Sequence, residues 1–121
     1  MRDPSFSQLV QEALALIPAE FQPYLENVAV ILEEVPDKAT RRRLGLRGDE
    51  TLYGLYEGTP LTERTHGQPL MPDRIRIFRQ PLVEEFPDPE ELRREVATTV
   101  IHELAHHFGI DEDRLEELGF G

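Results

Sequence analysis

A short segment near the end of the sequence, HELAHH, has the residue types and the spacing of a metal site. Three of the four histidines of the chain lie in it, and Glu103 directly follows the first of them, His102. Histidines four residues apart lie on one face of an α-helix, so the imidazoles of His102 and His106 could bind a single ion. Glu103 could then take a proton from a water held by that ion, which is hydrolytic chemistry.

This chemistry requires a helix, and the sequence predicts one from Asp88 to about Phe108. Asp88 suits the N-cap, and Gly109 suits the C-terminal stop. The apolar residues of this helix form one stripe, and both ligand histidines lie outside it, so they should face away from the core. The alternative is a polar face that only contacts solvent, because H-E-x-x-H occurs by chance in about one in fifty shuffled sequences of this composition.

His107 differs from the other two histidines of the segment. On the same helix it projects beside Val96 and Val100, at the margin of the core. A half-buried histidine with one hydrogen bond is its simplest interpretation. The alternative is a supporting role, in which it contacts Glu103 or orients a ligand.

A catalytic zinc needs three protein ligands and an open fourth position. Three consecutive acids, Asp111, Glu112 and Asp113, follow the turn at Gly109 and could fold back toward the ion. They could equally cap a following helix, because acids stabilise a helix N-terminus. Both roles are compatible if one acid caps while another binds the metal.

The segment HELAHHFGIDE resembles the extended zincin motif, H-E-x-x-H-x-x-G-x-x followed by a third ligand. More narrowly, the chain resembles the small bacterial zincin-like metallopeptidases, the minimal zincins. The stretches LYGLYEGTPLTER (residues 52–64) and PDRI (residues 72–75) are also similar to that family. The resemblance implies one zincin-like domain over residues 1–121, one zinc ion per chain and hydrolysis of peptide bonds, with Glu103 as the general base.

The third ligand departs from the family pattern. The Asp-type zincins have aspartate at the eleventh position of the motif, where this sequence has Glu112. Glu112 is therefore the first choice, ahead of Asp113 and Asp111. The Met-turn of metzincins is missing, so the floor of the site should come from Leu118 or Phe120, unless both residues simply belong to the core.

The rest of the sequence predicts an α+β domain with a small, mostly antiparallel sheet. Short Gly/Pro-marked loops in the middle of the chain suggest antiparallel neighbours. The predicted helices cover residues 5–17, 37–44, 88–108 and 111–118, with helical turns near 18–24 and 81–86. The predicted strands cover 28–32, which should be buried, 51–56, and 74–79, which should have one wet face.

Composition restricts the partners. The net charge of −11 opposes nucleic acid and anionic membranes, and the absence of cysteine excludes disulfides and thiolate ligands. No apolar run has the length of a membrane span or a secretory signal, so we expect a cytoplasmic protein. The expected partner is a peptide or protein substrate, and a homodimer is left open.

Two other functions remain as alternatives. A metal-dependent endoribonuclease of similar ligand spacing is one, although such enzymes have histidine as third ligand and lack the glutamate after the first histidine. A non-catalytic zinc-binding domain is the other, and it would not need Glu103 as a base.

Several weaker candidates precede the helix. Tyr53, Tyr56, Arg64 and His66 could reach the cleft and stabilise an oxyanion, although a structural role is the simpler interpretation for each. The strand at 74–79 could bind an extended peptide along its edge.

Overall fold

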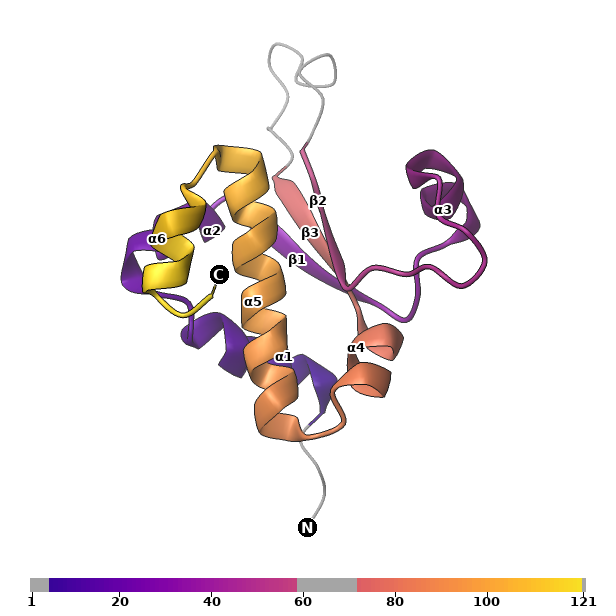
Figure 1. The fold of residues 1–121 in the computed structure, drawn as a ribbon, viewed down its shortest axis with the longest axis horizontal. Helices are drawn as coiled ribbons and strands as arrows, with labels where there is room; N and C mark the ends of the chain where they lie inside the picture. The colour runs from indigo at the N-terminus through magenta and orange to yellow at the C-terminus, as the bar shows by residue number, and fades with distance from the viewer. Residues whose placement is uncertain (1–4, 59–71, 121) are drawn as a thin grey trace.

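The longest helix, α5 (Pro89–Phe108), packs lengthwise against a small sheet and carries HELAHH at its C-terminal end. The computed structural model describes residues 5–58 and 72–120 (Figure 1). In chain order the other elements are α1 (Phe6–Ala15), the 3-10 turn η1 (Ala19–Phe21), α2 (Gln22–Leu25), β1 (Val28–Glu33), α3 (Lys38–Leu44), β2 (Gly54–Glu57), β3 (Asp73–Phe78), α4 (Arg79–Glu85) and α6 (Glu112–Glu117). The prediction of an α+β domain is confirmed.

The ends of α5 form as their residues predict. The Asp88 side chain accepts a hydrogen bond from the amide of Glu91 at 3.1 Å, and Pro89 opens the first turn. Gly109 ends the helix in the left-handed conformation, with φ 68°. This conformation favours glycine, because a Cβ would be strained there.

The three strands form a mixed sheet in the order β1-β3-β2. β2 pairs antiparallel with β3, with Gly54 opposite Ile77, whereas β1 pairs parallel with β3, with Val28 opposite Asp73. The prediction of a mostly antiparallel sheet is therefore wrong for β1. The connection from β1 to β3 contains α3 and β2, and a long connection of this kind allows parallel pairing.

The central and edge strands are exchanged relative to prediction. β3 lies between the other two strands, so its edge is not available to a peptide, and on its predicted wet face Arg74 is exposed but Arg76 is buried. β1 was expected to be buried, but it lies at the edge of the sheet, where Ile31 and Leu32 are each 37% exposed. Hydrophobic composition alone did not distinguish the two positions.

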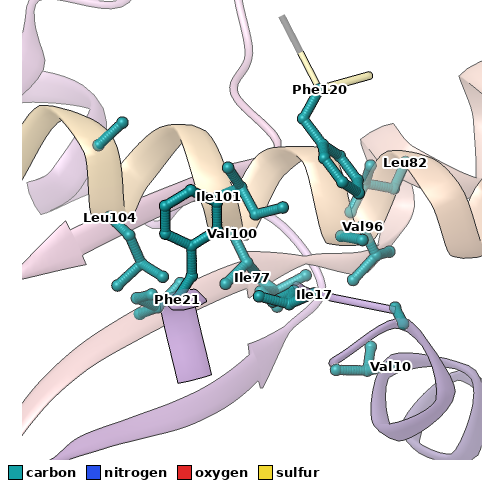
Figure 2. Close-up of a cluster of buried hydrophobic side chains, with 14 of the residues drawn as sticks. Val10, Ile17, Phe21, Ile77, Leu82, Val96, Val100, Ile101, Leu104 and Phe120 are labelled. Carbon is teal, nitrogen blue, oxygen red and sulfur yellow. The ribbon is translucent and has the colours of Figure 1, made fainter. Parts of the chain in front are cut away.

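One cluster of apolar side chains fills the space between α5, α1 and one face of the sheet (Figure 2). α5 contributes its whole apolar stripe, and β3 contributes Ile75 and Ile77, which are fully buried. The stripe consists of Leu92, Val96, Ala97, Val100, Ile101, Leu104 and Ala105. Since these side chains face the core, the opposite side of α5 is left for polar residues.

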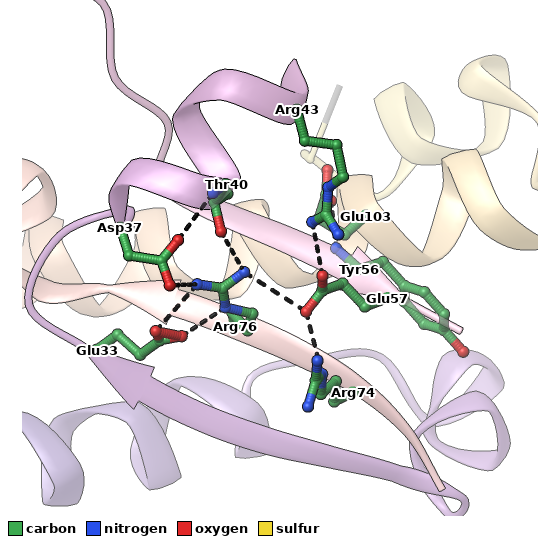
Figure 3. A network of polar contacts seen from close by, with 9 residues as sticks. All are labelled: Glu33, Asp37, Thr40, Arg43, Tyr56, Glu57, Arg74, Arg76 and Glu103. Carbon is green, nitrogen blue, oxygen red and sulfur yellow. Dashed lines mark hydrogen bonds and ion pairs between the residues drawn. The ribbon is translucent and has the colours of Figure 1, made fainter. Parts of the chain in front are cut away.

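The other face of the sheet holds a polar network under α3 (Figure 3). At its centre lies Arg76, only 7% exposed, which donates to the Glu33 carboxylate and to the Thr40 hydroxyl at 2.8 Å. Glu57 on β2 pairs with Arg43 at 2.7 Å and with Arg74 at 3.0 Å. The network fixes β2 from the face opposite to α5.

Within the described part of the chain, no helix has the length and apolarity needed to cross a membrane.

Candidate metal centre

The helix α5 presents the motif away from the core, as the sequence predicts. His102 and Glu103 are partly buried, and the side chain of His106 is 68% exposed. Their helical neighbours Ile101 and Leu104 are fully buried. The two predicted ligand histidines and the predicted base therefore lie on the accessible side of α5.

Glu103 contacts the edge strand β2. Its Oε1 accepts a hydrogen bond from the backbone amide of Tyr56 at 2.8 Å. β2 pairs with β3 on its inner side, and no strand pairs with its outer side among residues 5–58 and 72–120. The Glu103 carboxylate is thus bonded to an amide of β2 that does not take part in the sheet ladder.

Gly54 allows this close approach of β2 to α5. A Cβ at this position would lie 2.7 Å from Cγ2 of Thr99 and 3.2 Å from the carbonyl oxygen of Arg76. Because real Cβ atoms do not approach other atoms as closely as 2.7 Å, any larger residue would force the strand and the helix apart.

His102 is oriented by the C-terminal segment. Its Nε2 lies 2.6 Å from the carbonyl oxygen of Phe120, whose ring is buried in the core cluster. A carbonyl oxygen only accepts, so Nε2 carries the proton and a neutral ring keeps its lone pair on Nδ1. Phe120, one of the two residues expected at the floor of the site, thus reaches it through its backbone, whereas Leu118 packs against the core.

His106 and His107 have different surroundings. Nδ1 of His106 lies 3.9 Å from Oε2 of Glu103. The ring of His107 stacks on that of Tyr56, with centroids 4.0 Å apart, and its Nε2 lies 3.8 Å from Oδ2 of Asp73. The tyrosine hydroxyl also donates to Asp73, at 2.6 Å. His107 is therefore fixed by ring stacking, and the hydrogen bond that was expected for it is not formed with any of the described residues.

Of the three acids after Gly109, one has a clear structural role. The Asp111 side chain is the N-cap of α6 and accepts from the amide of Asp113 at 3.0 Å. Glu112 and Asp113 occupy the first turn of α6 and are exposed. Across the described ranges, no three ligating side chains are grouped as a metal site, so Glu112 as third ligand stays a prediction.

The donor set nevertheless fits a zinc ion. His102 and His106 supply two imidazoles from adjacent turns of one helix face, and the ring of the first is held by a backbone carbonyl. Metal-binding histidines usually donate their second nitrogen to such an oxygen, which fixes the tautomer and the ring orientation. Carboxylates at 111–113 follow directly, and imidazole and carboxylate are both zinc ligands.

A groove adjoins Glu103 on the N-terminal side of the motif. Its volume is about 330 Å³, and it lies between the start of β2 and one face of α5. The residues that line it are Leu52, Tyr53, Gly54, Glu95, Thr98, Thr99, His102 and Glu103. On the strand side of the groove, only Tyr53 was predicted as a site residue. The helix residues Glu95, Thr98 and Thr99 share one face with His102, and this spacing was the signal that could have found them.

Tyr53 is the predicted oxyanion candidate that lines this groove. Its ring meets that of Phe86 edge to face, with centroids 5.8 Å apart. Burial, and then the charges of Glu85 and Glu95, raise the pKa of the Tyr53 hydroxyl, so it keeps its proton at neutral pH. Of the other candidates, Tyr56 donates its hydroxyl to Asp73, whereas Arg64 and His66 lie outside the described residues.

Comparison with known proteins identifies the family of this chain. A family model described as zincin-like metallopeptidase matches residues 25–121, which include all three strands, α5 and the acids that follow it. None of the curated proteins matches the chain. Since the match covers most of the sequence, together with the motif and the strand that contacts Glu103, the chain belongs to the zincin-like metallopeptidase family.

Proposed function

We propose that this chain is a zinc-dependent metallopeptidase in which Glu103 is the general base. His102 and His106 would hold one zinc ion per chain, with Glu112 as the third ligand. The observation that carries the proposal is the hydrogen bond from the Tyr56 amide to Glu103, because it sets the predicted base at the outer edge of a strand. An extended peptide could pair with that edge by strand addition and so bring its carbonyl groups past the carboxylate.

Two residues of the chain would have separate roles in hydrolysis. Glu103 would accept the proton of the attacking water and later deliver it to the leaving amine. The Tyr53 hydroxyl, which is protonated at neutral pH, could donate to the oxyanion from the groove wall. Bound zinc would supply Lewis acidity, which makes water a nucleophile at neutral pH and polarises the scissile carbonyl.

We infer a peptide or an unfolded protein segment as the substrate, since strand addition requires an extended backbone. The net charge of −11 supports a protein substrate over nucleic acid. The cysteine-free composition supports a cytoplasmic location, where structural disulfides are rare.

The test is the substitution Glu103→Gln in protein loaded with zinc. We expect peptide hydrolysis to fall about 10²- to 10⁴-fold, the usual contribution of a general base, while zinc content stays unchanged. Glu90→Gln is the matched control, because Glu90 is exposed on the same helix and the charge change is identical. Hydrolysis by Glu103→Gln at the wild-type rate would refute the mechanism, and zinc binding without hydrolysis by any variant would favour a non-catalytic zinc domain.

A further inference from the structure

The groove beside Glu103 has a strongly asymmetric charge. Two carboxylates line it, those of Glu95 and Glu103, and no arginine or lysine among the described residues does. Oε1 of Glu103 is already bonded to the Tyr56 amide. The carboxylate of Glu95, by contrast, makes no hydrogen bond or ion pair within residues 5–58 and 72–120, although the residue is partly buried.

The basic residues closest in sequence to Glu95 form hydrogen bonds with other groups. Arg93 donates to the Glu12 carboxylate of α1 at 2.9 Å, and Arg94 donates to the carbonyl oxygen of Gly119 at 3.0 Å. Neither of them lines the groove. Within the part of the chain that the structure describes, the charge of Glu95 is therefore uncompensated, next to the proposed catalytic carboxylate.

The Tyr53 hydroxyl, on the strand side of the groove, has a pKa above its ordinary value. Burial raises the pKa of the Tyr53 hydroxyl first, and the negative charges of Glu85 and Glu95 raise it further. A field of this sign favours a cationic group over a neutral one of the same shape.

We propose that Glu95 is a specificity-determining residue and that the groove receives the arginine or lysine side chain of the substrate residue next to the scissile bond. This inference rests on the proposed peptidase function. The volume of about 330 Å³ is large enough for one long side chain. The aromatic ring of Tyr53 and the hydroxyl-bearing Thr98 and Thr99 complete a lining that fits an aliphatic stem and a cationic head.

A binding experiment tests the groove without requiring catalysis. N-acetyl-arginine methylamide and its neutral isostere, N-acetyl-citrulline methylamide, are titrated into the full chain while the backbone amides of Gly54 and Thr99 are followed by NMR. We expect the arginine compound to bind about two- to fivefold more tightly, a preference typical of one partly exposed ion pair. Glu95→Gln should remove the preference and Glu90→Gln should keep it. Equal binding of the two compounds, or a preference that survives Glu95→Gln, would overturn the proposal.

A cleavage experiment separates this inference from the function on which it rests. The zinc-loaded protein is given a peptide set in which the residues beside the central bond vary. Faster cleavage next to arginine and lysine, lost in Glu95→Gln, would support both proposals. Cleavage without that preference would overturn the role of Glu95 and keep the peptidase. If no peptide were cleaved while the arginine compound still bound through Glu95, the proposed peptidase function would be refuted, but the preference of the groove for a cationic side chain would be supported.

Discussion

The backbone amide of Tyr56 lies 2.8 Å from Oε1 of Glu103 and donates to it, which joins the edge strand β2 to the polar face of α5. The same residue stacks its ring on His107 and donates its hydroxyl to Asp73. Tyr56 therefore holds the predicted base with its backbone and the end of the motif with its side chain. Changes that move β2 should act on the site even when they lie outside it.

Gly54→Ala is the most direct way to move β2. The added Cβ would overlap Cγ2 of Thr99, and overpacking of this kind costs about 1–3 kcal/mol of unfolding free energy. We expect lower stability in urea unfolding and slower hydrolysis. Adding Thr99→Ser, which removes Cγ2, should restore a large part of both, and Thr99→Ser alone is the control. If the double variant were no better than Gly54→Ala, the contact with Thr99 would not be the cause.

The third ligand can be identified by zinc content. Mass spectrometry of protein purified without a metal-affinity tag should find one zinc per chain, and Glu112→Ala should lose it or bind it much more weakly. Asp113→Ala should retain the metal. Asp111→Ala should also retain it, but lose about 1 kcal/mol of stability because Asp111 caps α6. Loss of zinc from Asp113→Ala alone would transfer the assignment to that residue.

The contact between His102 and the Phe120 carbonyl predicts that the C-terminus affects the metal. Removing residues 120–121 should weaken zinc binding about 10- to 100-fold, since partners that orient a ligand contribute that much. Phe120→Leu is the matched control, because it keeps the carbonyl and trims only the buried ring. Zinc affinity that is unchanged or higher in the truncated protein would mean that the carbonyl does not orient the ligand.

The network under α3 predicts acid sensitivity. Burial alone would raise the pKa of Glu57, but Arg43, Arg76 and Arg74 outweigh it and leave the pKa below its ordinary value of 4.5. A carboxylate with a lowered pKa in the folded state stabilises the protein above the unfolded pKa, and this stabilisation is lost as the pH falls through the folded value. The free energy of unfolding should therefore decrease as the pH is lowered from 5 to about 3, as urea unfolding would measure.

Two variants check the origin of this acid sensitivity. Glu57→Gln should flatten the pH dependence, because the group that titrates is gone. Arg76→Leu should cost about 1–3 kcal/mol at neutral pH, since it removes the cation of the partly buried Glu33 carboxylate and one of the three arginines around Glu57. A pH profile of Glu57→Gln that matched the wild type would assign the acid sensitivity to other carboxylates.

The sequence predicted α5 and its motif closely because the signals are local. An aspartate cap, a glycine stop and an apolar stripe of helical period each act within a few residues, and together they determine which side of α5 His102 faces. The helix α3 was predicted for the same reason, from Asp37 and Gly45 at its ends.

The order of the strands could not be predicted from such signals. Alternation of arginine and isoleucine in β3 suggested one wet face, but long-range ion pairs allow Arg76 to be buried in the middle of the sheet. For the site, the contacts of Glu103 with Tyr56 and of His102 with Phe120 depend on how distant segments pack. Both contacts are made with backbone atoms, which every residue type has, so the identity of the partner residues does not reveal them.

The mixed sheet also has a consequence for how the protein folds. β2 and β3 are close in sequence and can pair early. β1 is farther from β3 in sequence, so their parallel pairing costs more chain entropy and should form later. We expect the edge that holds Glu103 to form before β1 docks. Substitutions in β1 should then accelerate unfolding with little change in the folding rate. This result would mean that β2 and β3 belong to the folding nucleus and that β1 joins the sheet last.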